Sequence, residues 1–329
     1  MNKTIRNIII IAVVVVVVLL AGLPLLNRLV YHRSLSATMF AWQLHKDRYT
    51  TEEAFDEYLD EKSAENAETY TIPEDAELTG AVQSLVTDGG MQYFTLNLTG
   101  DAAQKVIVYF PGGSYIDQPR AVHWMFLDAL AQDTGAGFIV PIYPKLPDND
   151  AETAYAALTA FYDEVVADLP CSELVFMGDS AGGGMALSFA MQLRDAGVTG
   201  PEELMLICPW VDVTLTNADI PAVEKHDPAL DSEMLRHLGE LWAGDLDTTD
   251  PVVSPLYGNL SGLGEITLFT TTGELLYPDI MLLDAALTDT GADHNIVTQT
   301  GVFHVWPLYF GYGVKEASAA YDEIVLMLG

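Results

Sequence analysis

One serine of the chain lies in a pattern that is typical of reactive serines. Residues 178–182 read Gly-Asp-Ser-Ala-Gly, which places Ser180 at the centre of a Gly-x-Ser-x-Gly sequence. The apolar residues 173–177 before it are typical of a short buried strand, and residues 181–196 after it are typical of a helix. Glycines on both sides let the backbone turn sharply and hold the hydroxyl clear of the main chain. The stretch therefore predicts a nucleophile elbow centred on Ser180.

A serine hydroxyl needs a general base, and two histidines are candidates. His294 precedes a predicted strand at 295–300, whereas His304 follows the end of that strand by four residues. Ligands and reacting groups of parallel sheets gather beyond the carboxyl ends of the strands. His294 would lie at the opposite edge of the sheet, so the sequence favours His304.

The base in turn needs an acid that orients it. A predicted strand at 266–271 leads into a loop that contains Glu274, three residues past the strand, and Asp279, eight residues past it. An aspartate after a turn that contains proline often caps the next helix, which is the simpler role for Asp279. The sequence favours Glu274 as the acid and keeps Asp279 as the alternative. In the non-functional interpretation, Glu274 is an ordinary solvent-exposed acid on a loop.

Backbone N–H groups that could bind an oxyanion follow another predicted strand, 105–110. The strand ends in Pro-Gly-Gly-Ser-Tyr at 111–115, and its glycines allow N–H groups to point into the site. The N–H of Ala181 would be a further donor, because it begins a helix whose dipole favours negative charge. We expect an oxyanion hole made by Gly112, Gly113 and Ala181.

Strand-like and helix-like segments alternate along most of the chain. The predicted strands are 81–87, 91–98, 105–110, 137–141, 173–177, 203–207, 266–271 and 295–300, and the predicted helices are 51–66, 152–169, 181–196, 231–243, 279–289 and 316–328. Asp-Gly-Gly at 88–90 predicts a hairpin between the first two strands, and Thr50 with Glu53 resembles a capping box. Repeated strand–helix units indicate a three-layer α/β sandwich with a mostly parallel central sheet. Residues 210–262 interrupt the alternation and predict a cap insertion above the carboxyl ends of the strands.

The first thirty residues differ in composition from the rest. Residues 8–26 are an uncharged, almost entirely apolar run, long enough as a helix to cross a bilayer. Because no nearby cleavage site follows it, we expect a membrane anchor in residues 1–30, with the short N-terminal tail in the cytoplasm and the catalytic domain outside. Residues 31–80 would form a linker and N-terminal cap helices, and residues 81–329 the catalytic domain.

Charge and cysteine placement exclude several classes of function. The 329 residues include 14 Lys or Arg and 47 Asp or Glu, and the first fifty residues hold six of the bases and one of the acids, which leaves a net charge of −38 on the remainder. Such a domain is repelled by nucleic acid. The histidines show no metal-ligand spacing, so no metal site is expected. Cys171 and Cys208 would lie at opposite ends of neighbouring strands, roughly 16 Å apart, which predicts two free buried thiols.

Several stretches together resemble one family, from about residue 80 to the end. The chain is similar to the hormone-sensitive-lipase-like branch of the α/β-hydrolases, the fold-3 group, in which the chain order is also serine, acid and histidine. Residues 178–183 are identical to the nucleophile motif of that family. Weaker matches are 106–115 to its strand and His-Gly-Gly-Gly, 208–212 to Ser-Pro-Trp-x-Asp, 253–256 to Ile-Ser-Pro-Leu, and 301–307 to its histidine loop.

The resemblance implies an esterase of short to medium acyl chains that is capped by N-terminal helices and requires no cofactor. Two departures stand out: Pro111 and Ser114 replace the first and last residues of His-Gly-Gly-Gly, and Glu274 replaces the usual aspartate. The oxyanion N–H groups of the family belong to glycines that match Gly112 and Gly113, so the hole is expected to survive.

The leading hypothesis is therefore a serine carboxylesterase or lipase acting on a small-molecule ester, with Ser180, His304 and Glu274 as the triad. A deacetylase of cell-envelope sugars would use the same chemistry. A non-catalytic hydrolase-like domain that binds a partner is the alternative from another class, and the oligomeric state stays open.

Overall fold

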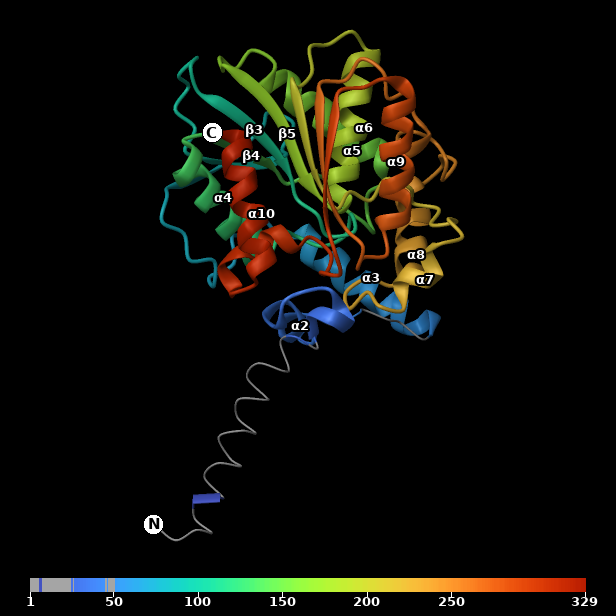
Figure 1. Ribbon diagram of the computed structural model, residues 1–329. Coiled ribbons are helices and arrows are strands. Elements are labelled where there is room, and N and C mark those ends of the chain that lie inside the picture. The colour runs from blue at the N-terminus through green and yellow to red at the C-terminus, as the bar shows by residue number, and fades with distance from the viewer. Residues whose placement is uncertain (1–5, 8–24, 26, 45, 47–50) are drawn as a thin grey trace.

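The computed structural model describes residues 6–7, 25, 27–44, 46 and 51–329 (Figure 1). The apolar run 8–26 of the anchor predicted in residues 1–30 lies outside these ranges except for Leu25, so the anchor stays a prediction. Among the residues that are described, no helix combines the length and the apolar character needed to cross a bilayer.

A single eight-stranded sheet forms the centre of the described part of the chain, in the order β1-β2-β4-β3-β5-β6-β7-β8. The first two strands form the predicted hairpin, β2 runs antiparallel to its neighbour β4, and the six strands from β3 to β8 are parallel. The strands are β1 (Val82–Val86), β2 (Gln92–Leu96), β3 (Lys105–Phe110), β4 (Gly137–Pro141), β5 (Glu173–Asp179), β6 (Glu203–Ile207), β7 (Glu265–Thr271) and β8 (His294–Gln299). All eight predicted strands are confirmed, with bounds that differ by two residues at most.

Helices cover both faces of this sheet and one of its edges (Figure 1). They are α2 (Leu35–Ala41), α3 (Glu52–Ala67), α4 (Ala121–Thr134), α5 (Ala151–Phe161), α6 (Ala181–Asp195), α7 (Ile220–Glu224), α8 (Ser232–Ala243), α9 (Tyr277–Thr290) and α10 (Lys315–Leu328), with a π-helical turn η1 (Tyr162–Val166) and two 3₁₀ segments, η2 (Pro255–Tyr257) and η3 (Trp306–Tyr312). The predicted three-layer sandwich is confirmed.

The two hydrophobic cores follow from the alternation of side chains along the strands. In β3, Val106, Val108 and Phe110 face the core formed with α5, α6 and α9. Ile107 and Tyr109 point to the other face, where α4 and α10 pack. Because both faces of a parallel strand are buried, such strands read as continuous apolar runs, which is why the sequence predicted them well.

Helix α4 has no counterpart among the predicted helices. Its apolar residues lie on more than one side: Val122, Trp124, Phe126, Leu127 and Leu130 are all buried, and so are His123 and Asp128. A helix that is covered on most sides shows no clear apolar stripe in its sequence. Its N-cap is Arg120, which gives none of the usual start signals.

Helix α3 begins one residue later than predicted. Thr51 is its N-cap, with a side-chain oxygen that accepts from the N–H of Ala54 at 3.2 Å, whereas Thr50 lies outside the described residues. We refer to α3, α7 and α8 as the cap helices, and Figure 1 shows them together at one end of the sheet. Tyr115, just past β3, stacks on Trp242 of α8 with ring centroids 4.1 Å apart. The cap helices therefore lie against the edge where the parallel strands end.

Helix α2 packs at the same edge, against the loop between β8 and η3. The ring of Phe40 lies 5.1 Å from that of Phe303, next to His304 in the chain. The guanidinium of Arg33 donates to the carbonyl oxygen of Gly301 at 2.9 Å. The segment that leads into the domain is thus attached to the loop that carries His304.

The register of the parallel strands brings the predicted site residues to one edge. Phe110 pairs with Gly178, Asp179 with Ile207, and Thr271 with Gln299. The loops that follow β3, β5, β7 and β8 therefore leave the sheet at nearly the same level.

Candidate active site

Ser180 occupies a strained turn between β5 and α6. Its φ of 54° and ψ of −124° fall outside the regions that most residues adopt. The flanking glycines leave no space for a side chain: a Cβ on Gly182 would lie 2.8 Å from the carbonyl carbon of Pro111, and one on Gly178 would lie 2.9 Å from the nitrogen of Gly183. Close backbone approach, rather than flexibility, explains the glycines of this motif.

The elbow is tied to the end of β6 by two backbone hydrogen bonds. The N–H of Ser180 donates to the carbonyl of Ile207 at 2.9 Å, and the N–H of Trp210 donates to the carbonyl of Ser180 at 2.8 Å. Segment 207–210 therefore lies directly beside the serine, and it places Cys208 next to the loops that follow β7 and β8.

His304 and Glu274 are in direct contact. Nδ1 of His304 and Oε2 of Glu274 are 2.5 Å apart, and Glu274 is fully buried. The other carboxylate oxygen accepts from the hydroxyl of Thr270 at 3.0 Å and from the N–H of Thr271 at 3.2 Å. Three donors thus fix the carboxylate, and the carboxylate fixes the tautomer and the orientation of the imidazole.

The second ring nitrogen of His304 is left available. Nε2 is buried and has no hydrogen-bond partner among the described residues. Ser180 is 8% exposed and His304 7% exposed, so both residues are largely shielded from water. Such an imidazole can accept a proton from a nearby hydroxyl group. The hydrogen bond between a catalytic base and its nucleophile often forms or shortens only when substrate is bound.

The alternative candidates for the base and the acid lie elsewhere. His294 is the first residue of β8, at the opposite edge, and contacts Asp284 at 3.3 Å. Asp279 accepts from the side-chain amide of Asn217 at 2.9 Å, and burial raises its pKa to about 6. It is the third residue of α9 and not its cap, because Leu276 occupies the N-cap position.

The N–H of Gly112 does not point to an oxyanion position. It donates to Oδ1 of Asp179 at 2.9 Å, and the same oxygen accepts from the hydroxyl of Tyr109 at 2.7 Å. The other oxygen lies 3.4 Å from Nε2 of His123. The expectation that Gly112 serves as an oxyanion donor is therefore wrong for this structure, because its hydrogen is already used inside the protein.

The carboxylate of Asp179 is held ionised beneath the site. Burial alone would raise its pKa, but His123 and the hydrogen bonds from His123, Tyr109 and Gly112 lower the pKa below its ordinary value. The Gly-x-Ser-x-Gly pattern allows any residue at position 179, so it did not predict that this side chain binds the loop after β3.

The loop after β3 turns so that later N–H groups remain free. Gly113, Ser114 and Tyr115 have φ values of 127°, 53° and 62°, three consecutive residues in an unusual conformation. In the described part of the chain, the N–H groups of Gly113, Ser114 and Ala181 donate to no protein acceptor. Of the predicted donors, Gly113 and Ala181 therefore remain available, and Ser114 is a donor that the sequence did not single out.

Cys208, Glu274 and His304 form a compact cluster. A ligand atom from each lies within 4.8 Å of the others, and all three residues are buried. Within the described ranges no other group of three His, Cys, Asp or Glu side chains has this closeness, but Glu274 and His304 are already bonded to each other. Both cysteines are free; Cys208 is buried, whereas Cys171 is only half-buried, which corrects the expectation of two buried thiols.

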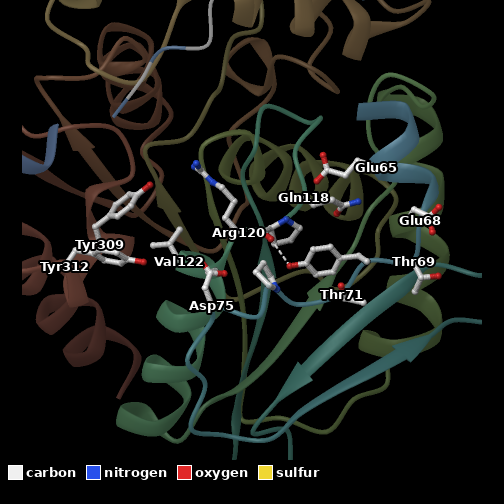
Figure 2. Close-up of a pocket in the computed structure, with 14 residues that line it drawn as sticks. Glu65, Glu68, Thr69, Thr71, Asp75, Gln118, Arg120, Val122, Tyr309 and Tyr312 are labelled. Atoms are coloured by element: carbon white, nitrogen blue, oxygen red, sulfur yellow. Dashed lines mark hydrogen bonds between the residues drawn. The ribbon is translucent and has the colours of Figure 1, made fainter. Parts of the chain in front are cut away.

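Figure 2 shows a recess of about 590 Å³ in the protein surface. It lies between residues 65–75, 118–122 and the tyrosines Tyr309 and Tyr312, and its lining does not include the residues of the elbow or of the cluster. Its polar wall carries Arg120 among acidic side chains. The residues that line this recess are therefore different from Ser180, Glu274 and His304.

The parallel sheet, the strained elbow and the loops that follow β3, β7 and β8 define an α/β-hydrolase fold. A family model described as alpha/beta hydrolase fold matches residues 107–308, and the chain belongs to this family. The chain is 28% identical over 238 residues to a triacylglycerol lipase of Mycobacterium tuberculosis, which covers 72% of this chain and 50% of the lipase. It is 28% identical over 206 residues to an acetyl-hydrolase of Streptomyces hygroscopicus, which covers 62% of this chain and 69% of that protein.

A solved structure gives the same assignment. A hormone-sensitive lipase from a metagenome library is 25% identical, with a TM-score of 0.73 over 89% of this chain and 94% of that chain. The resemblance to the hormone-sensitive-lipase-like group is therefore confirmed. This chain spans about half the length of the mycobacterial lipase that it matches.

Proposed function

We propose that the protein is a serine hydrolase that cleaves carboxylic esters through an acyl-enzyme. The observation that carries the proposal is the arrangement of His304, which is bonded to Glu274 through Nδ1 and leaves Nε2 free at the edge that bears Ser180. Membership of a family that contains esterases and lipases supports it.

In the proposed reaction, the hydroxyl oxygen of Ser180 attacks the ester carbonyl carbon while Nε2 of His304 takes its proton. Glu274 stabilises the imidazolium that forms, because its carboxylate is buried and already accepts the Nδ1 proton. His304 then gives the proton to the leaving alcohol as the carbon–oxygen bond breaks. Water repeats the cycle on the acyl-enzyme, which releases the carboxylic acid and restores the serine.

The negative oxygen of each tetrahedral intermediate needs donors that are not otherwise engaged. We assign this role to the N–H groups of Gly113, Ser114 and Ala181, in place of the set that includes Gly112. Gly112 instead supports the loop through Asp179. Donors held in a fixed geometry stabilise the developing charge without reorganising during the reaction.

The substrate class that fits best is an ester with a short to medium acyl chain. Tyr115, next to the proposed oxyanion donors in the loop after β3, stacks with both Trp210 and Trp242, with ring centroids at 5.3 and 4.1 Å. Packed rings narrow the space beside the loop, which favours small acyl groups. The relative named as an acetyl-hydrolase supports acetyl esters, including those of sugars, as a second candidate within the same chemistry.

The proposal is tested with p-nitrophenyl esters from acetate to decanoate and the full-length chain. We expect hydrolysis that is fastest between two and six carbons and that is lost in Ser180→Ala. Ser261→Ala changes an exposed serine and serves as the control. Activity that persists in Ser180→Ala would refute the nucleophile, and a folded wild type that cleaves none of these esters would favour a non-catalytic binding module.

A further inference from the structure

Cys208 has no part in the reaction described above, yet it lies against the proposed acid and base. It follows β6, is fully buried, and has a φ of 49°, which is unusual for a residue with a side chain. Its own N–H donates to the carbonyl of Phe269 in β7 at 2.7 Å. This backbone bond anchors Cys208 between the strand of the elbow and the strand that leads to Glu274.

The sulfur atom contacts both loops of the acid–base pair. Sγ accepts from the N–H of Val305 at 3.3 Å, so it binds the residue directly after His304. The sulfur, a carboxylate oxygen of Glu274 and a ring nitrogen of His304 all lie within 4.8 Å of one another. A single side chain thus connects the loop after β7 with the loop after β8.

The thiol keeps its proton in these surroundings. Burial raises the pKa of Cys208 well above its ordinary value, and the charge of Glu274 and a hydrogen bond with that side chain raise it further. An S–H group facing a carboxylate is a weak donor to it. The sulfur lies within 4.8 Å of a carboxylate oxygen of Glu274, so the S–H can turn toward this carboxylate. Thr270, Thr271 and His304 are the donors that the carboxylate already has.

We propose that Cys208 is a positioning residue for the acid–base pair: its S–H donates to Glu274 while its sulfur accepts from the N–H of Val305. The thiol fixes the distance between the two loops and so the geometry in which Glu274 holds His304. The proposal rests on the proposed function, since it assigns a role within the same site.

Loss of the thiol should change the chemistry rather than the binding of substrate. Glu274 would lose one donor and the N–H of Val305 would lose its acceptor. Both loops would then hold Glu274 and His304 less firmly in their relative positions. A small misplacement of a catalytic group lowers the rate of the chemical step with little effect on ground-state binding. The expected result is a lower kcat with an unchanged KM.

The pH dependence supplies a second readout. Without the S–H donor the charge on Glu274 is less dispersed, so it should stabilise protonated His304 more strongly. The acid limb of kcat/KM should then move to higher pH. Two other carboxylates act on this cluster, Asp179 from β5 and Asp227 from the cap insertion, and neither is altered by the substitution.

The experiment compares Cys208→Ala and Cys208→Ser with Cys171→Ala, which removes the other, half-buried thiol and serves as the matched control. In Cys208→Ala we expect kcat to fall roughly tenfold, KM to stay within about twofold, and the acid limb to move upward. Cys208→Ser keeps a donor and an acceptor and should recover most of the rate. Cys171→Ala should match the wild type.

Three outcomes would overturn the role of Cys208: a wild-type kcat and pH profile in Cys208→Ala, a loss in Cys208→Ser as large as in Cys208→Ala, or an equal loss in Cys171→Ala. If Cys208→Ala does not fold, Cys208→Ser decides alone, because the proposal requires it to keep a near-normal rate and pH profile.

A readout without substrate separates this proposal from the proposed function. The proton between Nδ1 of His304 and Glu274 should give a downfield proton NMR signal that His304→Ala removes and that Cys208→Ala shifts. If the wild type hydrolyses no ester but the signal shifts, the positioning role stands while the esterase proposal fails. A signal that is the same in Cys208→Ala and in the wild type would overturn the positioning role whatever the activity.

Discussion

The N–H of Gly112 donates to the carboxylate of Asp179 at 2.9 Å, which joins the loop after β3 to the residue that precedes the nucleophile. The bond crosses between two neighbouring parallel strands at the level where both end. Asp179 therefore sets the position of the loop whose next N–H groups we assign to the oxyanion, although it contacts no substrate itself.

Asp179→Asn should lower kcat without removing the nucleophile. Nδ1 of His123 accepts from the N–H of Arg120 at 2.9 Å, so Nε2 carries the proton and faces Asp179 as a donor. Asparagine has one NH₂ donor where aspartate has a second oxygen. If this NH₂ faces Nε2 of His123, two donors face each other; if the side chain turns over, the NH₂ faces the N–H of Gly112, which is also a donor. We expect kcat to fall roughly 10- to 100-fold, less than the full loss of an oxyanion donor.

The control for that substitution is Asp322→Asn, which changes an exposed aspartate of α10. Steady-state kinetics and the melting temperature of each variant separate lost chemistry from lost stability. An Asp179→Asn enzyme with wild-type kcat would contradict the supporting role of this carboxylate.

Glu274→Gln and Asp279→Asn should have very different effects on activity. A side-chain amide at position 274 keeps the shape of the acid but not the charge that stabilises protonated His304, so kcat should fall roughly 10³- to 10⁴-fold. Asp279 binds Asn217 and has no contact with His304, so Asp279→Asn should leave kcat within about threefold of the wild type. Steady-state kinetics on one short-chain ester measures both effects. Equal losses in the two variants would reopen the choice between the two acids.

Asp279 should make the protein less stable as the pH rises through the weakly acidic range. Burial raises its pKa from 3.8 to about 6, so the folded state holds a proton that the unfolded state has already released. The free energy of unfolding contributed by this group therefore falls between about pH 4 and pH 6 and is constant above, a loss of roughly 2 to 3 kcal/mol. Urea unfolding at about pH 4.5 and about pH 8 measures it.

Asp279→Asn mimics the protonated carboxyl and should remove this part of the pH dependence. At about pH 8 the variant should be at least as stable as the wild type, and near pH 4 the two should agree. If the variant shows the same fall in stability as the wild type, the pKa of Asp279 is not raised.

Phe40→Ala should reduce activity through the loop that carries His304. Phe40 of α2 lies 5.1 Å from the ring of Phe303 and 4.8 Å from that of Tyr309, on either side of the histidine in the chain. We expect kcat to fall roughly two- to fivefold with KM nearly unchanged, because the loop loses packing but keeps its hydrogen bonds. Steady-state kinetics on one short-chain ester measures both constants.

Met39→Ala is the matched control for Phe40→Ala, because Met39 lies on the same helix with 55% of its surface exposed. Equal kinetics in the two variants would show that α2 has no effect on the histidine loop.

Much of the fold could be predicted from the sequence because buried parallel strands consist of short runs of apolar residues. The rule that reacting groups collect at the carboxyl ends of such strands then separated His304 from His294 without any coordinates. The helices that were missed are different in kind: α4 is apolar on most of its sides, and α2 and α7 are too short to show a period.

The oxyanion loop could not be predicted to the same level. Its sequence gives two glycines, but which N–H is free depends on an acceptor from another strand, Asp179, about seventy residues later in the chain. The contacts of Cys208 could not be predicted either, because its partner comes from a distant part of the chain. The spacing predicted its separation from Cys171 but not its contact with Val305. Local pattern determines backbone shape better than it determines hydrogen-bond partners.

The attachment of α2 has a mechanical consequence. Arg33 is bonded to Gly301, three residues before His304, and the hydroxyl of Ser34 is bonded to Glu316 of α10 at 2.7 Å. Tension applied to the N-terminal end of the chain would reach these two bonds before it reaches the sheet. One of them lies on the histidine loop, so a load on the N-terminus would be transmitted to the proposed base while the sheet stays undeformed.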